Sequence, residues 1–102
     1  MSFNLHNVEV GDILTCTALC GIAFGYAAEA GEVVGKFIVV SKQPFYNNSA
    51  SGGPGLTLHI IQAKKDYPPI SNNVGRNCTF RIGAMTSPTV VWNLDYRPEA
   101  SI

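Results

Sequence analysis

The chain has 102 residues, a length that fits one domain and leaves no room for two of ordinary size. Apolar residues make up 46% of the chain, and this content excludes a disordered protein. Seven basic and seven acidic residues give a net charge of zero, so the basic excess typical of nucleic-acid binders is missing. We therefore predict a single domain over residues 1–102 that does not bind nucleic acid in general.

The N-terminal residues lack a basic segment followed by an apolar one, which is the pattern of a secretory signal. The uncharged stretch 13–28 is shorter than the roughly 20 residues that span a membrane, and it is rich in Gly, Thr and Cys. We therefore predict a cytoplasmic protein that makes no membrane contact. In that compartment the three cysteines are expected to be free thiols.

Five segments carry the pattern of β-strands. Each combines alternating apolar residues with β-branched and aromatic side chains, and each is bounded by Gly, Pro, Asn or Ser. In chain order they are 8–17, 33–41, 56–63, 78–83 and 89–96. Segment 23–32 is compatible either with a short helix that stops at Gly31 or with a β-hairpin. We predict an all-β fold, a small antiparallel barrel of five to six strands with at most one short helix. A β-sandwich is the alternative.

Two long polar segments connect the expected strands. The first, 44–55, is rich in glycine, and its backbone amides could face an anion. The second, 64–77, combines positive charge, an aromatic ring and side-chain amides, which together suit a small anionic ligand. The residues predicted to bind such a ligand are Gly52, Gly53, His59, Lys64, Lys65, Tyr67, Asn72, Asn73, Arg76 and Arg81.

An apolar segment, 18–30, lies between the first two expected strands. Its large side chains, set among small residues, predict a subunit or partner interface formed by Leu19, Ile22, Phe24 and Tyr26. A chain with only 14% charged residues is also poorly protected against self-association, so we expect a homo-oligomer.

The spacing of nucleophiles, bases and metal ligands indicates neither a catalytic site nor a metal site. Cys16 and Cys20 are close in sequence, but Cys78 and the two histidines are too scattered for a zinc site. No nucleophile stands with a base and an orienting group, so we expect no enzyme, no catalytic residue, no metal and no cofactor.

The sequence therefore predicts a non-catalytic module that holds or sequesters a small, nucleotide-like anionic ligand. The alternative is a protein–protein interaction module, such as an inhibitor, an adaptor or a component of a larger assembly.

Overall fold

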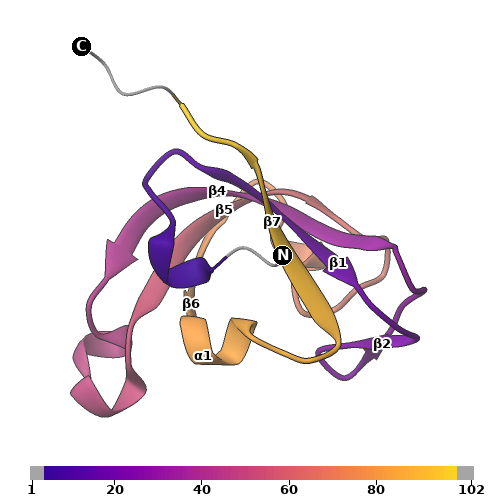
Figure 1. Ribbon diagram of the computed structural model, residues 1–102, viewed down its shortest axis with the longest axis horizontal. Helices are drawn as coiled ribbons and strands as arrows, with labels where there is room; N and C mark the ends of the chain where they lie inside the picture. The colour runs from indigo at the N-terminus through magenta and orange to yellow at the C-terminus, as the bar shows by residue number, and fades with distance from the viewer. Residues whose placement is uncertain (1–3, 99–102) are drawn as a thin grey trace.

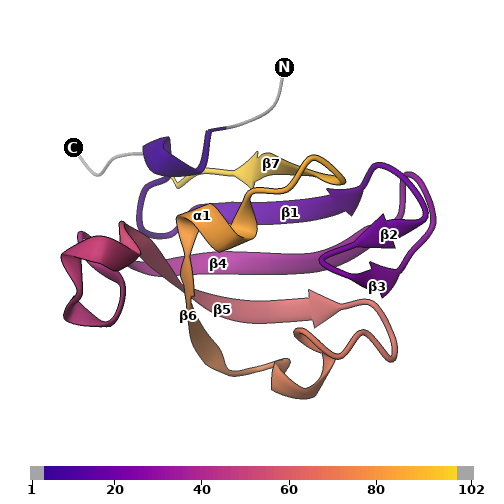
Figure 2. The ribbon, with the colours of Figure 1, turned by 90° about the horizontal axis from the view of Figure 1, so that it is seen from below.

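The computed structural model describes residues 4–98 and has an antiparallel sheet of five strands in the order β6-β5-β4-β1-β7. These strands are β1 (Ile13–Ala18), β4 (Val33–Gln43), β5 (Gly55–Ala63), β6 (Asn77–Arg81) and β7 (Val90–Tyr96). They form a meander whose last strand returns beside the first, and Figure 2 shows β7, β1, β4 and β5 side by side. The predicted all-β, antiparallel class is confirmed. The sheet does not close into a barrel within residues 4–98.

The sheet curls because its strands contain irregularities. The pairing register shifts twice between β4 and β5, at Lys36/Phe37 and at Val39/Ser41. It shifts once between β1 and β4 and once between β1 and β7. Such bulges bend a strand and increase its twist. Figure 1 accordingly shows the strands arching over the space in which the short helix α1 (Ile82–Met85) lies.

Three sequence predictions are changed by the structure. Residues 8–12 do not extend the first strand, because Gly11 has a φ of 96° in a turn. The fourth strand ends at Arg81, since Ile82 begins α1 and accepts the amide of Thr86 there. Between β1 and β4 the hairpin alternative is correct, and the hairpin consists of β2 (Ile22–Ala23) and β3 (Tyr26–Ala27).

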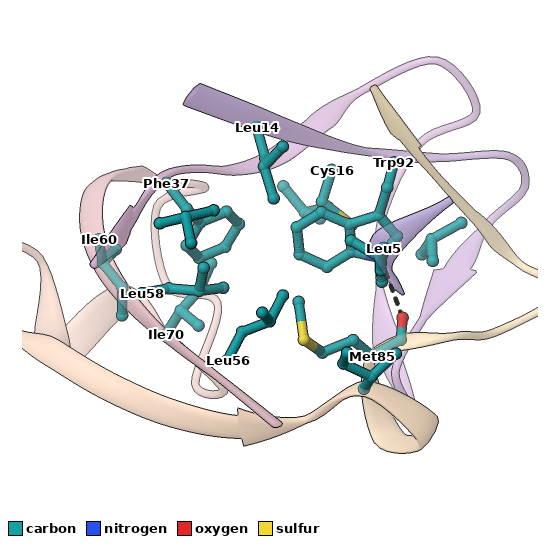
Figure 3. Packing of buried hydrophobic residues seen from close by; sticks show 14 of the residues in the cluster. Leu5, Leu14, Cys16, Phe37, Leu56, Leu58, Ile60, Ile70, Met85 and Trp92 are labelled. Atoms are coloured by element: carbon teal, nitrogen blue, oxygen red, sulfur yellow. Dashed lines mark hydrogen bonds between the residues drawn. The ribbon is translucent and has the colours of Figure 1, made fainter. Parts of the chain in front are cut away.

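The two faces of the sheet differ in polarity, as expected for an antiparallel sheet with one solvated side. The convex face carries hydrogen-bonded polar pairs, such as Thr57 with Thr79 at 2.8 Å and Gln43 with Thr57 at 3.2 Å. The concave face carries the buried apolar residues, and Figure 3 shows several of their side chains pointing toward one another. Phe37 and Trp92 meet there with ring centroids 5.3 Å apart.

An ion pair between a buried carboxylate and a half-buried arginine fixes the two ends of the described chain to each other. Asp12 is fully buried, and its carboxylate accepts bonds from Arg97 Nε at 3.0 Å and Nη2 at 2.8 Å. It also accepts the amide of Glu9 at 2.8 Å. Arg97 further donates to the Asn7 carbonyl, so this cluster joins the turn before β1 to the end of β7. The hydrogen bond from Arg97 holds the pKa of the Asp12 carboxyl below its usual range, although burial opposes the effect.

We predict that Asp12→Asn lowers the free energy of unfolding by about 1.5 to 3 kcal/mol near pH 7, because it removes the charge of a buried carboxylate that is hydrogen-bonded to Arg97. The pKa of the Asp12 carboxyl is lower in the folded protein than in the unfolded chain, where it is about 4. The stabilisation by Asp12 is therefore complete above about pH 4 and is lost as the pH falls through the folded-state pKa. Urea unfolding at about pH 7 and about pH 2 measures both effects. The difference between the variant and the wild type should shrink at the lower pH.

The control for this prediction is Glu9→Gln, because Glu9 also lies 3.4 Å from Arg97 but its side chain is exposed. An exposed ion pair contributes about 0 to 1 kcal/mol. Equal losses in the two variants would contradict the assignment of the stabilisation to the buried carboxylate.

Two phenylalanines of the main sheet, Phe37 of β4 and Phe80 of β6, differ in how deeply they are buried. Phe37 is buried, whereas Phe80 is only partly buried on the edge strand β6. We predict that Phe37→Ala destabilises the domain by about 3 to 5 kcal/mol and that Phe80→Ala costs clearly less. Chemical unfolding of both variants checks this order, and a smaller loss for Phe37→Ala than for Phe80→Ala would contradict it.

Candidate functional site

The concave side of the sheet contains an apolar cavity of about 100 Å³. Every residue that lines it is apolar or aromatic, apart from a cysteine thiol and the hydroxyl of a tyrosine. The lining residues are Cys16, Phe24, Val34, Phe37, Leu58, Tyr67, Pro69, Ile70, Phe80, Ala84, Met85 and Trp92. They come from all five strands of the main sheet, from α1, from the β2–β3 turn and from the loop after β5.

The floor of the cavity is held by hydrogen bonds from its own aromatic side chains. Trp92 Nε1 donates to the Met85 carbonyl at 2.9 Å, which ties β7 to α1 (dashed in Figure 3). The hydroxyl of Tyr67 donates to the Ala23 carbonyl at 2.7 Å, which ties the loop after β5 to the hairpin. Burial raises the pKa of Tyr67 to about 12, so the hydroxyl keeps its proton and remains a donor.

A close approach shapes one wall of the cavity. A Cβ at Gly35 would lie 2.6 Å from both Ile70 Cδ1 and Phe37 Cζ, distances at which heavy atoms overlap. Only glycine at this position therefore lets the Ile70 and Phe37 side chains meet over β4.

The rim of the cavity is less buried than the floor. Phe24, Pro69 and Phe80 are half-buried, and Ala84 is exposed. Phe24 adopts a left-handed φ of 51° in the two-residue turn between β2 and β3, a conformation that is costly for a bulky side chain. Its side chain nevertheless packs against the core, so the turn directs an aromatic ring to the rim.

The residues predicted to bind an anion do not form one site. Arg81 pairs with Gly55 at one end of β5, while Lys64 and Lys65 follow Ala63 at the other end. At about 3.3 Å per residue the two ends of β5 are roughly 26 Å apart, which exceeds the reach of one small ligand. Arg76 lies nearer the lysine end, because its carbonyl oxygen accepts the amide of Ile60.

Three further members of that predicted set need correction. The amides of Gly52 and Gly53 donate to the carbonyls of Ser49 and Ala50 within the loop, so they are not free for an anion. Tyr67 is only 2% exposed and belongs to the core and the cavity wall, not to a polar surface. The sequence did not reveal this, because Tyr67 stands in a polar, proline-containing segment with no apolar periodicity.

The remaining candidates are found on the surface. His59 lies on the convex face, where Nδ1 bonds Asn77 Oδ1 at 2.8 Å. Asn72 and Asn73 belong to the 3₁₀ turn Ser71–Asn73 in the loop after β5. In the predicted interface, Leu19, Ile22 and Tyr26 are exposed, while Phe24 turns toward the cavity. The edge of the Tyr26 ring meets Tyr67, with the ring centroids 5.9 Å apart.

Within residues 4–98 no group of three or more His, Cys, Asp and Glu side chains is placed to hold a metal ion. No helix of that part of the chain is both long and apolar enough to cross a membrane. Comparison of the chain with protein-family models, curated proteins and solved structures gave no match.

The thiols provide a probe of the cavity. Cys16 is buried in its floor, and burial raises the pKa of this thiol to about 12, whereas Cys20 is exposed. A thiol with a raised pKa stays protonated and unreactive. We predict that an alkylating reagent at about pH 8 modifies Cys16 at least roughly 100-fold more slowly than Cys20. Peptide mapping by mass spectrometry gives both rates, and similar rates would show that the floor is open to solvent.

Proposed function

We propose that this domain is a non-catalytic protein-interaction module that holds one apolar side chain of a partner polypeptide in the concave cavity. The observation that carries the proposal is the lining itself, which contains no charged residue and five aromatic rings. Such a lining suits a neutral apolar group, since a charged group would lose its hydration without gaining a partner. Aromatic residues and methionine are also enriched where proteins bind one another.

The size of the cavity supports a single side chain over a free small molecule. Sites for cofactors and drug-sized ligands usually measure about 300 to 1,000 Å³. A cavity that admits benzene measures about 150 Å³, whereas this one measures about 100 Å³. The space therefore fits an aliphatic or thioether group of the size of a leucine or methionine side chain.

The energy available from the cavity sets a limit on affinity. Burying a side chain of that size contributes about 1.5 to 3 kcal/mol. A micromolar complex needs about 8 kcal/mol. The cavity therefore supplies selectivity and part of the affinity, and the partner must gain the remainder from contacts outside it.

A second candidate function is the holding of a small anionic ligand, and one observation favours it. Lys64, Lys65 and Arg76 stand at the same end of the β5–β6 pair, and Lys65 and Arg76 are exposed. Native mass spectrometry of the purified protein detects a carried-over ligand, and the same measurement counts subunits in the homo-oligomer that we expect in the cytoplasm. Loss of a bound anion in Arg76→Ala would support this candidate.

The cavity proposal is tested by closing the rim. Ala84 is an exposed rim residue, so we predict that Ala84→Trp covers the cavity with little change in stability. Peptides selected from a random display library on the wild-type domain should share an apolar anchor residue. Their affinity for Ala84→Trp should fall at least about tenfold, measured by fluorescence polarisation.

The matched control is Ala50→Trp, which adds the same side chain at an exposed position in the loop between β4 and β5. Its affinity should stay within about twofold of the wild type. Selected peptides without a shared apolar residue, or equal binding to the two tryptophan variants, would refute the proposal.

A further inference from the structure

The free edge of β6 has unused backbone hydrogen-bonding groups. Ile82 N donates to the Pro54 carbonyl and Ile60 N donates to the Arg76 carbonyl, each at 3.0 Å. In an antiparallel pair, bonded and non-bonded residue pairs alternate, so these bonds fix the phase of the β5–β6 ladder. Cys78 and Phe80 therefore bond β5, while the N–H and C=O groups of Asn77, Thr79 and Arg81 point outward. No other backbone segment within residues 4–98 bonds these three outward residues.

The other free edge of the sheet, that of β7, is obstructed. The amide of Val90 is taken by the Ser87 carbonyl at 3.3 Å. Toward its end, β7 has a register shift opposite Ile13/Leu14, and Arg97 is bonded to the Asn7 carbonyl just beyond it. Bulges and covering segments of this kind protect an edge from pairing. The pairing of β6 with β5 contains no register shift. The edge of β6 is therefore better suited than that of β7 to pair with an added strand.

The β6 edge also adjoins the cavity. Phe80 points to the concave side and lines the cavity, and Ala84 of α1 lines it just after β6 ends. Figure 2 shows β6 passing in front of the other strands and leading directly into α1, with the β2–β3 hairpin at the other side of α1. A strand added to β6 would run alongside Phe80, and its concave-facing side chains would lie next to the cavity rim.

The charges around this edge have one sign. Arg76 precedes β6 and Arg81 ends it, and both are exposed. Residues 76–81 contain no acidic side chain, and among residues 4–98 no salt bridge involves either arginine. Opposite charges on neighbouring strands stabilise a pair, whereas like charges destabilise it. A segment with acidic residues would therefore fit this edge better than a basic one.

We infer that an extended segment of a partner polypeptide adds to the free edge of β6 as a further strand and inserts one leucine- or methionine-sized side chain into the cavity. This inference rests on the function proposed above and names the partner's chemistry. Alternation along the added strand places the residues on either side of the anchor on the convex face, where an acidic side chain can meet Arg81. The backbone hydrogen bonds between the added strand and β6 supply the part of the affinity that the cavity alone does not provide.

The test uses heptapeptides of sequence Thr-Thr-Glu-X-Glu-Thr-Thr, blocked at both ends, titrated into the whole domain and followed by NMR. Peptides with X as Leu or Met should bind at least about tenfold more tightly than the peptide with X as Ala. Replacing both glutamates by lysine should weaken binding. In the complex, the amides of Asn77, Thr79 and Arg81 should become protected from hydrogen exchange.

The decisive variant is Thr79→Pro, which removes an outward amide and leaves the inner ladder intact, as edge strands allow. Its matched control is Thr79→Ala, which also loses the hydroxyl bond to Thr57 but keeps the amide. Thr79→Pro should weaken the Leu peptide at least about tenfold, and Thr79→Ala should stay within about twofold.

The two proposals fail in different ways. If Ala84→Trp abolishes binding while Thr79→Pro binds like Thr79→Ala, the cavity function stands and edge pairing is refuted. If Ala84→Trp binds the Leu peptide normally, the cavity function is refuted. Should Thr79→Pro fail to fold, exchange in the wild-type complex decides, because unprotected amides at Asn77, Thr79 and Arg81 would overturn the inference. The inference would also be overturned if none of the peptides binds the wild-type domain.

Discussion

The buried apolar residues of the sheet face one side, and segments that are not strands have to cover that side. The loop after β5 supplies Tyr67 and Ile70, α1 supplies Ile82 and Met85, and the N-terminal turn supplies Leu5. A buried hydroxyl that lacks a partner costs free energy, so the bond from Tyr67 to the Ala23 carbonyl fixes where the loop and the hairpin meet. The cavity is the space that these covering segments leave between them, and its position therefore follows from the curl of the sheet and the Tyr67 bond.

Period-two alternation predicted the strands because it reports on a sheet with one buried face, and each of the five predicted segments overlaps a strand of the sheet. Some ends were also correct, such as the start of β4 at Val33 and the end of β7 at Tyr96, but others depend on single bonds and turns that leave no periodic signal. Ile82 continues the apolar alternation of Cys78 and Phe80 in sequence, yet it starts α1. Asp12 falls inside the predicted strand 8–17, and it is instead a buried carboxylate bonded to Arg97, a partner 85 positions away along the chain. Asp95 stands only two positions before Arg97 in the sequence, yet its carboxylate lies 3.4 Å from Lys36 Nζ.

The site could be predicted only in part, for a related reason. Residue types can be read from a sequence, but whether two residues lie close together in the fold depends on the end of the strand at which each one stands. Lys64 and Arg81 were predicted to bind the same ligand, and the length of β5 separates them. The cavity residues come from eight parts of the chain: the five strands of the main sheet, α1, the β2–β3 turn and the loop after β5. Phe24 was expected at an interface for its apolar surroundings, and its actual position at the rim depends on a left-handed turn that no residue pattern specifies.

An apolar cavity and an unpaired strand edge are each a cost to a small domain, since an unfilled space forfeits contacts and a bare edge invites aggregation. In this domain both lie along β6, the strand whose inward side chains are only half-buried. One added strand would fill the cavity and pair the edge together, because the same segment that bonds the outward amides brings its alternate side chains to the rim.

The strand edge and the cavity would also contribute differently to recognition of the partner. Backbone bonds accept any extended chain of suitable charge, whereas a space of about 100 Å³ discriminates among side chains. A domain with no net charge and few charged residues has little long-range electrostatic attraction with which to choose a partner, so its selectivity has to come from shape at short range.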